Sequence, residues 1–452
     1  MQSAVKDARP CYPMNFMKGI GMSVFQNSSD GPNPKAPSNW GHFIKKKNYL
    51  GQKEYKSAWE SSNDFWNLYE ADIKLARGMG ATSFRFSFEW SRIEPLGPGQ
   101  VDEEAVERFH AIIDCIHANG MEPMCTLHHF THPQWFEEMG GFTADENIPY
   151  FVSYCKRMFG WYGSKIKLWA TINEPTCFSF VGYIASLWCP GQIAGFTQCG
   201  KVLVNLLRSH VAAYKEIKSL PGGERACVGI VHQHIHFKSK AGCAPHIQVL
   251  CSWMTYWFGC DIILKFFKTG VFEWKTPLFG VTISFKSEDA PHCVDWWGIN
   301  YYSQPCVSPF FVMGACGDEP VSDMGFRMCP KGMSQAIRDA SILYRPMYIT
   351  ETGAADKDSR FRRKIIEEHC AEIQRCIADG YDVRGMYYWT LMDNIEWHEG
   401  FHVKYGLYEW DPVVQRSKGL RLRPGSEALK EVYDRWPDRL EVMQKYAEKH
   451  SE

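Results

Sequence analysis

The sequence of 452 residues has few of the features that mark membrane, nucleic-acid or dinucleotide-binding proteins. It has no run of about 18 apolar residues, so we expect no membrane span. Its net charge is −1, so no long-range field favours binding to nucleic acid or to an anionic membrane. No glycine-rich phosphate loop follows an early strand, as it would in most dinucleotide-binding folds.

Cysteine is abundant, at 17 residues, but it lacks the spacing of a zinc site or of a disulfide framework. There is no C-x-x-C pair, and many cysteines lie inside apolar runs, where a thiol acts as a small hydrophobe. The first ten residues, MQSAVKDARP, lack the apolar segment of a signal peptide. We therefore expect a cytoplasmic protein in a reducing compartment, with no metal and no other cofactor.

Strand and helix patterns alternate along most of the chain. We expect strands at 16–26, 81–88, 121–127, 166–172, 226–232, 294–301, 347–350 and 384–391. We expect helices at 64–78, 102–119, 150–162, 202–219, 245–268, 333–343, 364–378 and 426–436. Three polar stretches, at 27–60, 176–200 and 303–330, are expected to be long loops.

Eight such strand–helix units favour an α/β fold, a single (β/α)8 TIM barrel with long βα rim loops. We place this one domain at residues 16–437, between an N-terminal tail at 1–15 and a C-terminal tail at 438–452. A doubly wound open sheet is the structural alternative.

Two of the expected strands end in glutamate. Met347–Gly353 reads MYITETG and ends on Glu351, and Leu168–Pro175 reads LWATINEP and ends on Glu174. A single polar residue at a strand end is most often an ordinary loop start. In a parallel barrel, however, both carboxylates reach the same rim, with Arg85 at the end of another strand. Such a pair suits glycoside hydrolysis, in which one carboxyl group gives a proton and an ionised one attacks the anomeric carbon.

At these residues the chain resembles glycoside hydrolase family 1, the β-glucosidase-like (β/α)8 enzymes. The resemblance covers about residues 16–433. Its motifs are Arg85–Phe86–Ser87, Trp90–Ser91–Arg92, Thr126–Leu127 with His129, Thr171–Ile172–Asn173–Glu174–Pro175, Gly298–Ile299–Asn300–Tyr301–Tyr302, Thr350–Glu351 and Trp389–Thr390–Leu391–Met392–Asp393–Asn394–Ile395–Glu396–Trp397. Together these motifs are highly specific, although no single one of them would be.

The resemblance implies the roles of these residues. Glu351 would be the nucleophile and Glu174 the acid/base, with Arg85 and Tyr302 holding the nucleophile. The substrate-binding residues would be Gln26, His129, Phe130, Asn173, Asn300, Trp389, Glu396 and Trp397. The implied activity is that of a retaining exo-β-glycosidase that forms a covalent glycosyl-enzyme on Glu351.

The chain departs from the family pattern at three positions. Ser28 replaces a usual glutamate, Phe130 a usual tryptophan and Thr352 a usual asparagine. None of these changes removes a catalytic group, so they bear on sugar preference. Relatives that act on 6-phosphoglycosides carry serine and lysine where this chain has Glu396 and Val403, so an unphosphorylated glycoside is expected.

The expected substrate is a small β-D-glucoside, with galactosides and fucosides as alternatives. A transglycosidase would use the same carboxylates with a sugar, lipid or alcohol in place of water. An inactive sugar-binding barrel is a third hypothesis, although such proteins usually lose one glutamate. The aglycone and the oligomeric state are left open; Trp188, Phe196, Phe310 and Phe311 in the rim loops suggest an aryl or apolar leaving group.

Overall fold

The computed structural model describes residues 15–47, 56–240, 243–276, 280–308, 313–412 and 420–437. Residues 1–14 and 438–452, which hold nearly all of the two expected tails, lie outside these ranges.

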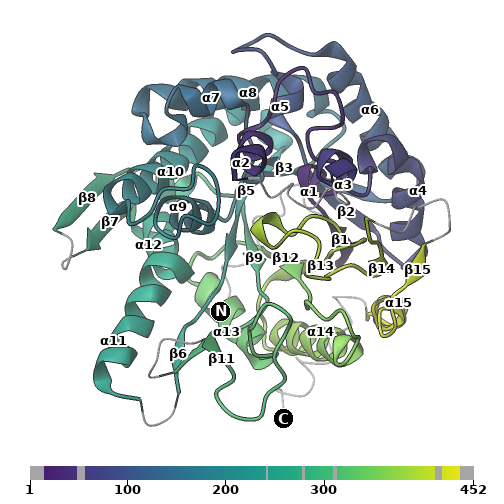
Figure 1. Ribbon diagram of the computed structural model, residues 1–452, viewed down its shortest axis with the longest axis vertical. Coiled ribbons are helices and arrows are strands. Elements are labelled where there is room, and N and C mark those ends of the chain that lie inside the picture. Colours follow the sequence, from purple (N-terminus) through teal and green to yellow (C-terminus); the bar gives the residue numbers. More distant parts are fainter. Residues whose placement is uncertain are drawn as a thin grey trace.

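Eight parallel strands close into a barrel in the order β1-β13-β12-β9-β5-β4-β3-β2. The strands are β1 (Met17–Gly21), β2 (Ser83–Ser87), β3 (Glu122–His128), β4 (Leu168–Asn173), β5 (Cys227–Gln233), β9 (Trp296–Asn300), β12 (Met347–Thr352) and β13 (Val383–Trp389). Helices surround the barrel (Figure 1). The predicted (β/α)8 fold is therefore confirmed, and the open-sheet alternative is wrong.

The surrounding helices follow the expected pattern to within a few residues at most ends. They are α4 (Phe65–Gly78), α6 (Glu103–Ala118), α8 (Ile148–Tyr162), α10 (Phe196–Ser219), α11 (Pro245–Met254), α12 (Asp261–Thr269), α13 (Lys331–Ser341), α14 (Arg362–Ala378) and α15 (Glu427–Asp434). In α6, for example, Asp102 Oδ1 accepts a hydrogen bond from the Glu104 amide at 3.1 Å, which caps the helix. Its apolar stripe is buried against the barrel at Val106, Phe109 and Ile113.

The first expected strand and the loop after it are different in the structure. The strand ends at Gly21, because Ser23 caps the short helix α1 (Val24–Ser28), which contains Gln26. The expected loop at 27–60 holds α2 (Asn39–Lys47) and α3 (Lys56–Ser61). Three lysines end α2 and glycine interrupts it, so its sequence is a weak helix former; burial of Trp40 and Phe43 stabilises it.

A β-hairpin and a helix are among the other elements that the sequence did not predict. The hairpin of β7 (Val271–Thr276) and β8 (Val281–Lys286) lies outside the barrel, between α12 and β9. Helix α9 (Pro175–Tyr183) occupies the start of the expected loop at 176–200, with proline at its first position. It is apolar on nearly every side, so it has no clear helical period that would predict it.

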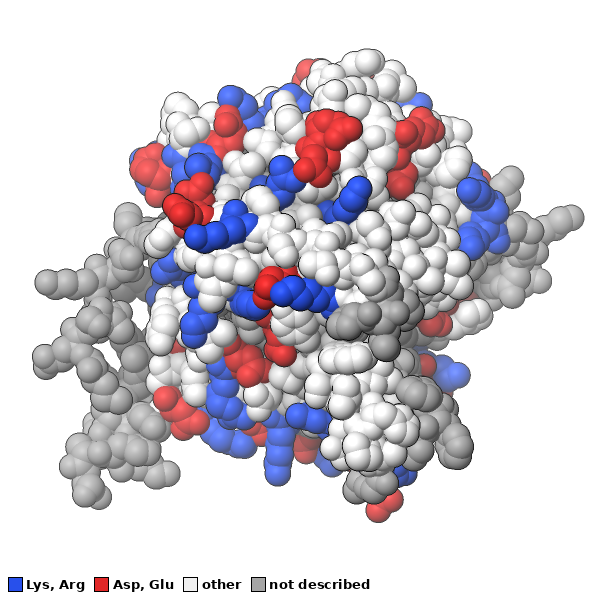
Figure 2. All heavy atoms as spheres, turned by 90° about the vertical axis from the view of Figure 1, so that its left-hand side faces the viewer, with Lys and Arg blue, Asp and Glu red and all other residues white. Residues whose placement is uncertain are grey.

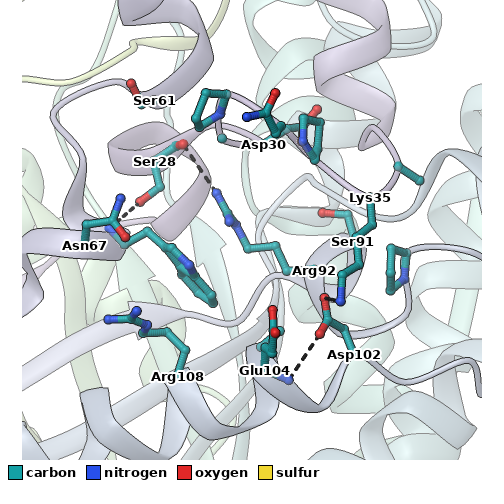
Figure 3. Close-up of a pocket in the computed structure, with 18 of the residues that line it drawn as sticks. Ser28, Asp30, Lys35, Ser61, Asn67, Ser91, Arg92, Asp102, Glu104 and Arg108 are labelled. Atoms are coloured by element: carbon teal, nitrogen blue, oxygen red, sulfur yellow. Dashed lines mark hydrogen bonds and ion pairs between the residues drawn. The ribbon is translucent and has the colours of Figure 1, made fainter.

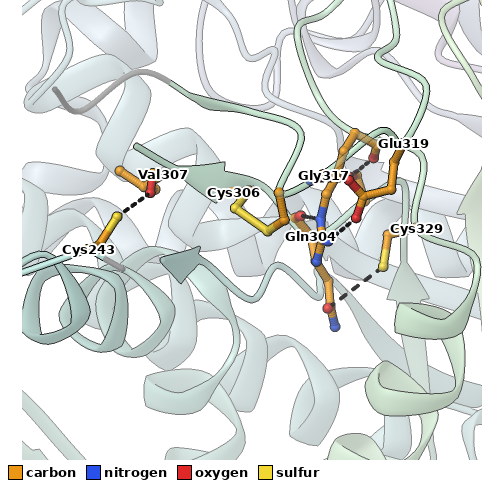
Figure 4. The surroundings of a disulfide bond; sticks show 10 residues. Cys243, Gln304, Cys306, Val307, Gly317, Glu319 and Cys329 are labelled. Atoms are coloured by element: carbon orange, nitrogen blue, oxygen red, sulfur yellow. Dashed lines mark hydrogen bonds and ion pairs between the residues drawn. A yellow bond between two sulfur atoms is a disulfide. The ribbon is translucent and has the colours of Figure 1, made fainter. Parts of the chain in front are cut away.

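A disulfide joins Cys306 and Cys316, although the spacing of the cysteines indicates no disulfide framework. The antiparallel pairing of β10 (Cys306–Val307) with β11 (Met313–Gly314) brings the two Cα atoms to 5.4 Å (Figure 4). Two cysteines ten residues apart match no known disulfide motif. This bond is therefore evident only from the pairing of β10 with β11 in the structure. The reducing, cytoplasmic setting stays a prediction.

Figure 2 shows positive and negative side chains interspersed over one face of the molecule. Within the described ranges no single helix is long and apolar enough to span a membrane. One pair, Pro245–Gly259 with Asp261–Thr269, reaches that length and composition together but is bent by 56°.

The lower half of the barrel interior is filled by apolar side chains, which gives the strand ends a rigid base. This cluster consists of Met17, Met124, Leu168, Ala170, Cys227, Val231, Trp296, Tyr348 and Tyr387. Gly229 lies within it, and a Cβ atom there would stand 2.5 Å from the ring of Trp296. Small and large residues therefore have to alternate across β5 and β9.

We predict that Gly229→Ala destabilises the protein by about 1–3 kcal/mol, because the added methyl group overpacks the barrel interior. Gly160→Ala is the matched control, since Gly160 is exposed on α8 with no atom within 4 Å of an added Cβ. It should leave stability equal or raise it by up to about 1 kcal/mol. Both variants and the parent protein are compared by their midpoints of thermal unfolding at one scan rate. A midpoint of Gly229→Ala equal to that of the parent would contradict the packing argument.

Candidate active site

Four barrel strands deliver polar side chains to one place at their carboxyl ends. Arg85 comes from β2, Asn173 from β4, Asn300 from β9 and Glu351 from β12. All four are buried, with Glu351 4% exposed. Glu174 follows β4 and is 8% exposed. This is the face of a (β/α)8 barrel where chemistry is expected.

The backbone is irregular at both carboxylates. The pairing of β4 with β5 shifts register between Ala170 and Asn173, and that of β12 with β9 shifts between Ile349 and Glu351. Such bulges change the direction of a side chain at the end of a strand. Glu174 itself has a φ of 43°, in the left-handed region that residues with a side chain rarely adopt. Strain of this kind is concentrated at functional sites.

Glu351 is held by two donors. The Arg85 guanidinium donates to Oε1 at 2.7 Å, and the Tyr302 hydroxyl donates to Oε2 at 2.7 Å. A cation and a hydroxyl therefore contact the two oxygens of this carboxylate. Burial and the charge of Glu351 together raise the pKa of the Tyr302 phenol, so this hydroxyl keeps its proton.

Glu174 has the opposite environment. Asn300 donates to its Oε1 at 2.8 Å, and neither lysine nor arginine bonds to it among the described residues. Burial, followed by repulsion from Glu351, raises the pKa of Glu174 to about 8, against the smaller lowering effects of Asn300 and Arg85. Glu174 therefore keeps its proton at neutral pH.

Asn173 links the two carboxyl groups. Its Oδ1 accepts from Arg85 at 2.9 Å and from Asn300 at 3.3 Å. Thr350 donates to Asn300 Oδ1 at 2.8 Å, which fixes the amide so that its nitrogen faces Glu174. The continuous chain of hydrogen bonds from Glu351 to Glu174 holds both groups in one arrangement.

A second polar pair comes from α1 and the segment after β13. Gln26 Nε2 donates to the Ile395 carbonyl at 3.0 Å and to Glu396 Oε2 at 3.3 Å. Burial, with repulsion from Glu351 and Glu174, raises the pKa of Glu396 to about 8. A neutral carboxyl group at this position both donates and accepts hydrogen bonds.

Aromatic rings surround these polar groups. The His129 ring lies nearly parallel to Trp389 and Trp397, with centroids at 5.6 and 6.1 Å. Phe130 contacts Trp397 edge-on at 5.1 Å and Trp188 at 4.7 Å. Burial and the charge of Arg85 lower the pKa of His129 well below its usual value, so the ring is neutral.

The side chains at two of the departures, Ser28 and Thr352, bond to groups other than the two carboxylates, although Thr352 directly follows Glu351. Ser28 accepts a hydrogen bond from the Trp66 amide at 3.0 Å and lines a separate hollow of about 350 Å³ with Arg92 and Asp102 (Figure 3). Thr352 is hydrogen bonded to His369 Nδ1 at 2.8 Å. Both side chains anchor elements of the fold.

Some functional candidates were missed and some lie elsewhere. Cys177, in the first turn of α9, has a small lowering effect on the pKa of Glu174, which opposes the larger effect of burial. Its position three residues after Glu174 was the available signal. Trp188 packs in the aromatic wall and Phe196 begins α10. Phe310 and Phe311 lie outside the described residues.

Comparison with known proteins decides the family. The model of glycosyl hydrolase family 1 matches residues 9–426. The chain belongs to this family. A solved β-glycosidase from Pyrococcus horikoshii is 30% identical, with a TM-score of 0.79 over 96% of this chain and 98% of that one.

Curated relatives of the family 1 chain carry related names. Beta-glucosidase 28 of Arabidopsis thaliana is 29% identical, over 88% of this chain and 78% of that protein. A β-galactosidase of Pyrococcus woesei is 26% identical, over 89% of this chain and 94% of that protein. The protein is a glycoside hydrolase that acts on O-glycosyl bonds, as the sequence predicted.

Proposed function

We propose that this family 1 enzyme is a retaining exo-β-glycosidase that hydrolyses unphosphorylated β-D-glucosides. The observation that carries the proposal is the contrast between its two carboxyl groups. Glu351 accepts from a cation and a phenol, whereas Glu174 is buried and has a pKa of about 8. A buried carboxyl group with a raised pKa is suited to act as the acid, and a carboxylate held beside a cation is suited to act as the nucleophile.

In the first step, Glu351 attacks the anomeric carbon while Glu174 gives its proton to the departing glycosidic oxygen. The product is a covalent glycosyl-enzyme and a free alcohol. Since the ester bond removes the charge of Glu351, the repulsion that raises the pKa of Glu174 is lost. Glu174 then ionises more readily.

In the second step, the ionised Glu174 takes a proton from water, whose oxygen attacks the same carbon from the face that the alcohol left. The sugar is released with its original configuration, and Glu351 regains its charge beside Arg85. Asn173, fixed between Arg85 and Asn300, is placed to bind the 2-hydroxyl of the sugar, where bonds strengthen in the transition state.

The sugar specificity is inferred from the outer polar pair and the rings. Gln26, Glu396 and His129 offer donors and acceptors for the remaining hydroxyls, and Trp389 and Trp397 offer flat apolar faces. A pKa of about 8 weakens the repulsion that Glu396 would exert on a phosphate. The case against phosphorylated sugars therefore depends more on Val403, which is buried and supplies no cation.

Replacing the nucleophile should abolish turnover. We predict that Glu351→Gln lowers kcat for an aryl β-glucoside by at least about 10⁴-fold, because the amide cannot form the glycosyl ester. Glu107→Gln, at an exposed position on α6, is the control and should keep the parent rate. In the parent enzyme a 2-deoxy-2-fluoroglucoside should label the peptide that contains Glu351. Normal turnover by Glu351→Gln, or a label elsewhere, would disprove the assignment.

Removing the acid should be correctable by an external nucleophile. We predict that Glu174→Ala loses hydrolysis of glucosides with poor leaving groups, while azide restores turnover of activated aryl glucosides and gives β-glucosyl azide. In the parent enzyme kcat/KM should fall as pH rises through about 8, because Glu174 must be protonated to act as an acid. Glu174→Ala should lose this decrease in kcat/KM at high pH. If the decrease is unchanged in the variant, a group other than Glu174 causes it.

A panel of aryl β-glycosides tests the substrate class. We predict that kcat/KM is highest for the glucoside, with lower values for the galactoside, fucoside and mannoside. The 6-phosphoglucoside should be the poorest of the set, since Val403 cannot pair with phosphate. A preference for the phosphorylated sugar would overturn this part of the proposal and leave the two-carboxylate mechanism intact.

A further inference from the structure

Three potential metal ligands meet outside the carboxylate site, although they are far apart in the sequence. His236 follows β5, Cys260 directly precedes α12, and Asp339 lies on α13. Their donor atoms all lie within 4.8 Å of one another. His236 Nε2 lies 2.6 Å from Asp339 Oδ2 and 3.8 Å from Cys260 Sγ.

We propose that His236, Cys260 and Asp339 bind a divalent cation of the Zn²⁺ class. Thiolate, imidazole and carboxylate together are the donors that zinc accepts, and the sulfur disfavours Mg²⁺ and Ca²⁺. Tetrahedral zinc holds nitrogen, oxygen and sulfur ligands about 3.3–3.8 Å apart. The sulfur–nitrogen distance of 3.8 Å already fits this range.

The contact between His236 and Asp339 is shorter than two zinc ligands would be. At 2.6 Å it is a hydrogen bond, which is how these groups satisfy each other without an ion. Zinc would replace the shared proton and separate the two atoms by about 0.7 Å more. Gln335 donates to the other oxygen of Asp339 at 2.7 Å and orients the carboxylate, as second-sphere groups do in metal sites.

The cluster carries more negative charge than its partners offset. Asp261 Oδ1 lies 3.5 Å from Cys260 Sγ, so two carboxylates and a thiol surround one imidazole. In the described part of the chain, neither lysine nor arginine forms an ion pair with Asp261 or Asp339.

The position of Cys260 is fixed by an unusual backbone. Residues Thr255–Gly259 form a π-helical turn between α11 and α12, and His232 Nε2 bonds to the Gly259 carbonyl at 2.7 Å. Such turns occur most often at functional sites. Cys260 is fully buried, while the side chains of His236 and Asp339 are 15% and 22% exposed. An ion can therefore enter from solvent, and water can take the fourth position.

The proposed ion would join α12 and α13 of the outer layer to the end of β5. Its ligands include neither Glu174 nor Glu351, so the site can exist whether or not the proposed glycosidase mechanism is right. The competing interpretation is an ion pair between His236 and Asp339, beside a buried thiol that binds no metal. A metal site and an ion pair can be distinguished by titrating the protein with metal ions.

The test uses the full chain, stripped with a chelator and titrated with CoCl2 and then ZnCl2. We expect about one Co²⁺ per chain with a thiolate-to-cobalt charge-transfer band, which Zn²⁺ removes by displacement. Cys260→Ser should lose the band, and Gln335→Ala should weaken binding about 10-fold. Cys251→Ser, at another buried free cysteine close by in sequence, is the matched control and should keep both.

The parent protein alone can disprove the site, so the result does not depend on variants that fold. The proposed site is wrong if Co²⁺ produces no thiolate-to-cobalt band, or if the band persists in Cys260→Ser. His236 and Asp339 would then form an ion pair without a metal. Zn²⁺ should also raise the unfolding temperature of the parent and of Cys251→Ser, with a smaller effect on His236→Gln. An equal rise in all three would place the ion elsewhere.

Discussion

The buried contact between Arg85 and Glu351 determines how the two carboxyl groups differ. Arg85 is fully buried and bonds at once to Glu351, to Asn173 and to the Thr350 carbonyl. Removing one partner of such a pair would leave an uncompensated buried charge, at a cost of about 3–5 kcal/mol. Burial, followed by repulsion from Glu351, raises the pKa of Glu174 to about 8, and Arg85, which bonds to Glu351, offsets this effect only in part. The position of the guanidinium therefore makes the surroundings of the two carboxyl groups unequal.

The barrel makes that position possible. Its lower half is a packed apolar cluster, so the strand ends above it cannot shift independently. Register shifts in β4 and β12 then direct Asn173 and Glu351 toward the centre. In a regular strand, successive side chains point to opposite faces of the sheet. Without the shift in β4, Asn173 would lose its contact with Arg85, and without the shift in β12, Thr350 would lose its contact with Asn300. The irregularities are therefore part of the site.

Much of this arrangement was predictable from sequence, because it depends on where parallel strands end. The apolar runs before Glu174 and Glu351 placed both residues at the same rim, and the helical stripes located most of the surrounding helices. Helix α2 was not predictable, since burial of Trp40 stabilises a segment with weak helical preference. The Cys306–Cys316 disulfide was missed for a similar reason, because it depends on a hairpin pairing that the spacing does not encode.

The cluster of His236, Cys260 and Asp339 could not be predicted from the sequence. Its members are separated by up to 103 residues, and only the packing of α12 and α13 beside β5 brings them together. The carboxylate site and this cluster also solve the same electrostatic problem differently. In the first, Arg85 offsets one charge and a proton neutralises the other. In the second, neither lysine nor arginine among the described residues forms an ion pair with Asp261 or Asp339, and the imidazole of His236 pairs with Asp339. A bound divalent cation would supply positive charge to these carboxylates, as the guanidinium of Arg85 does beside Glu351.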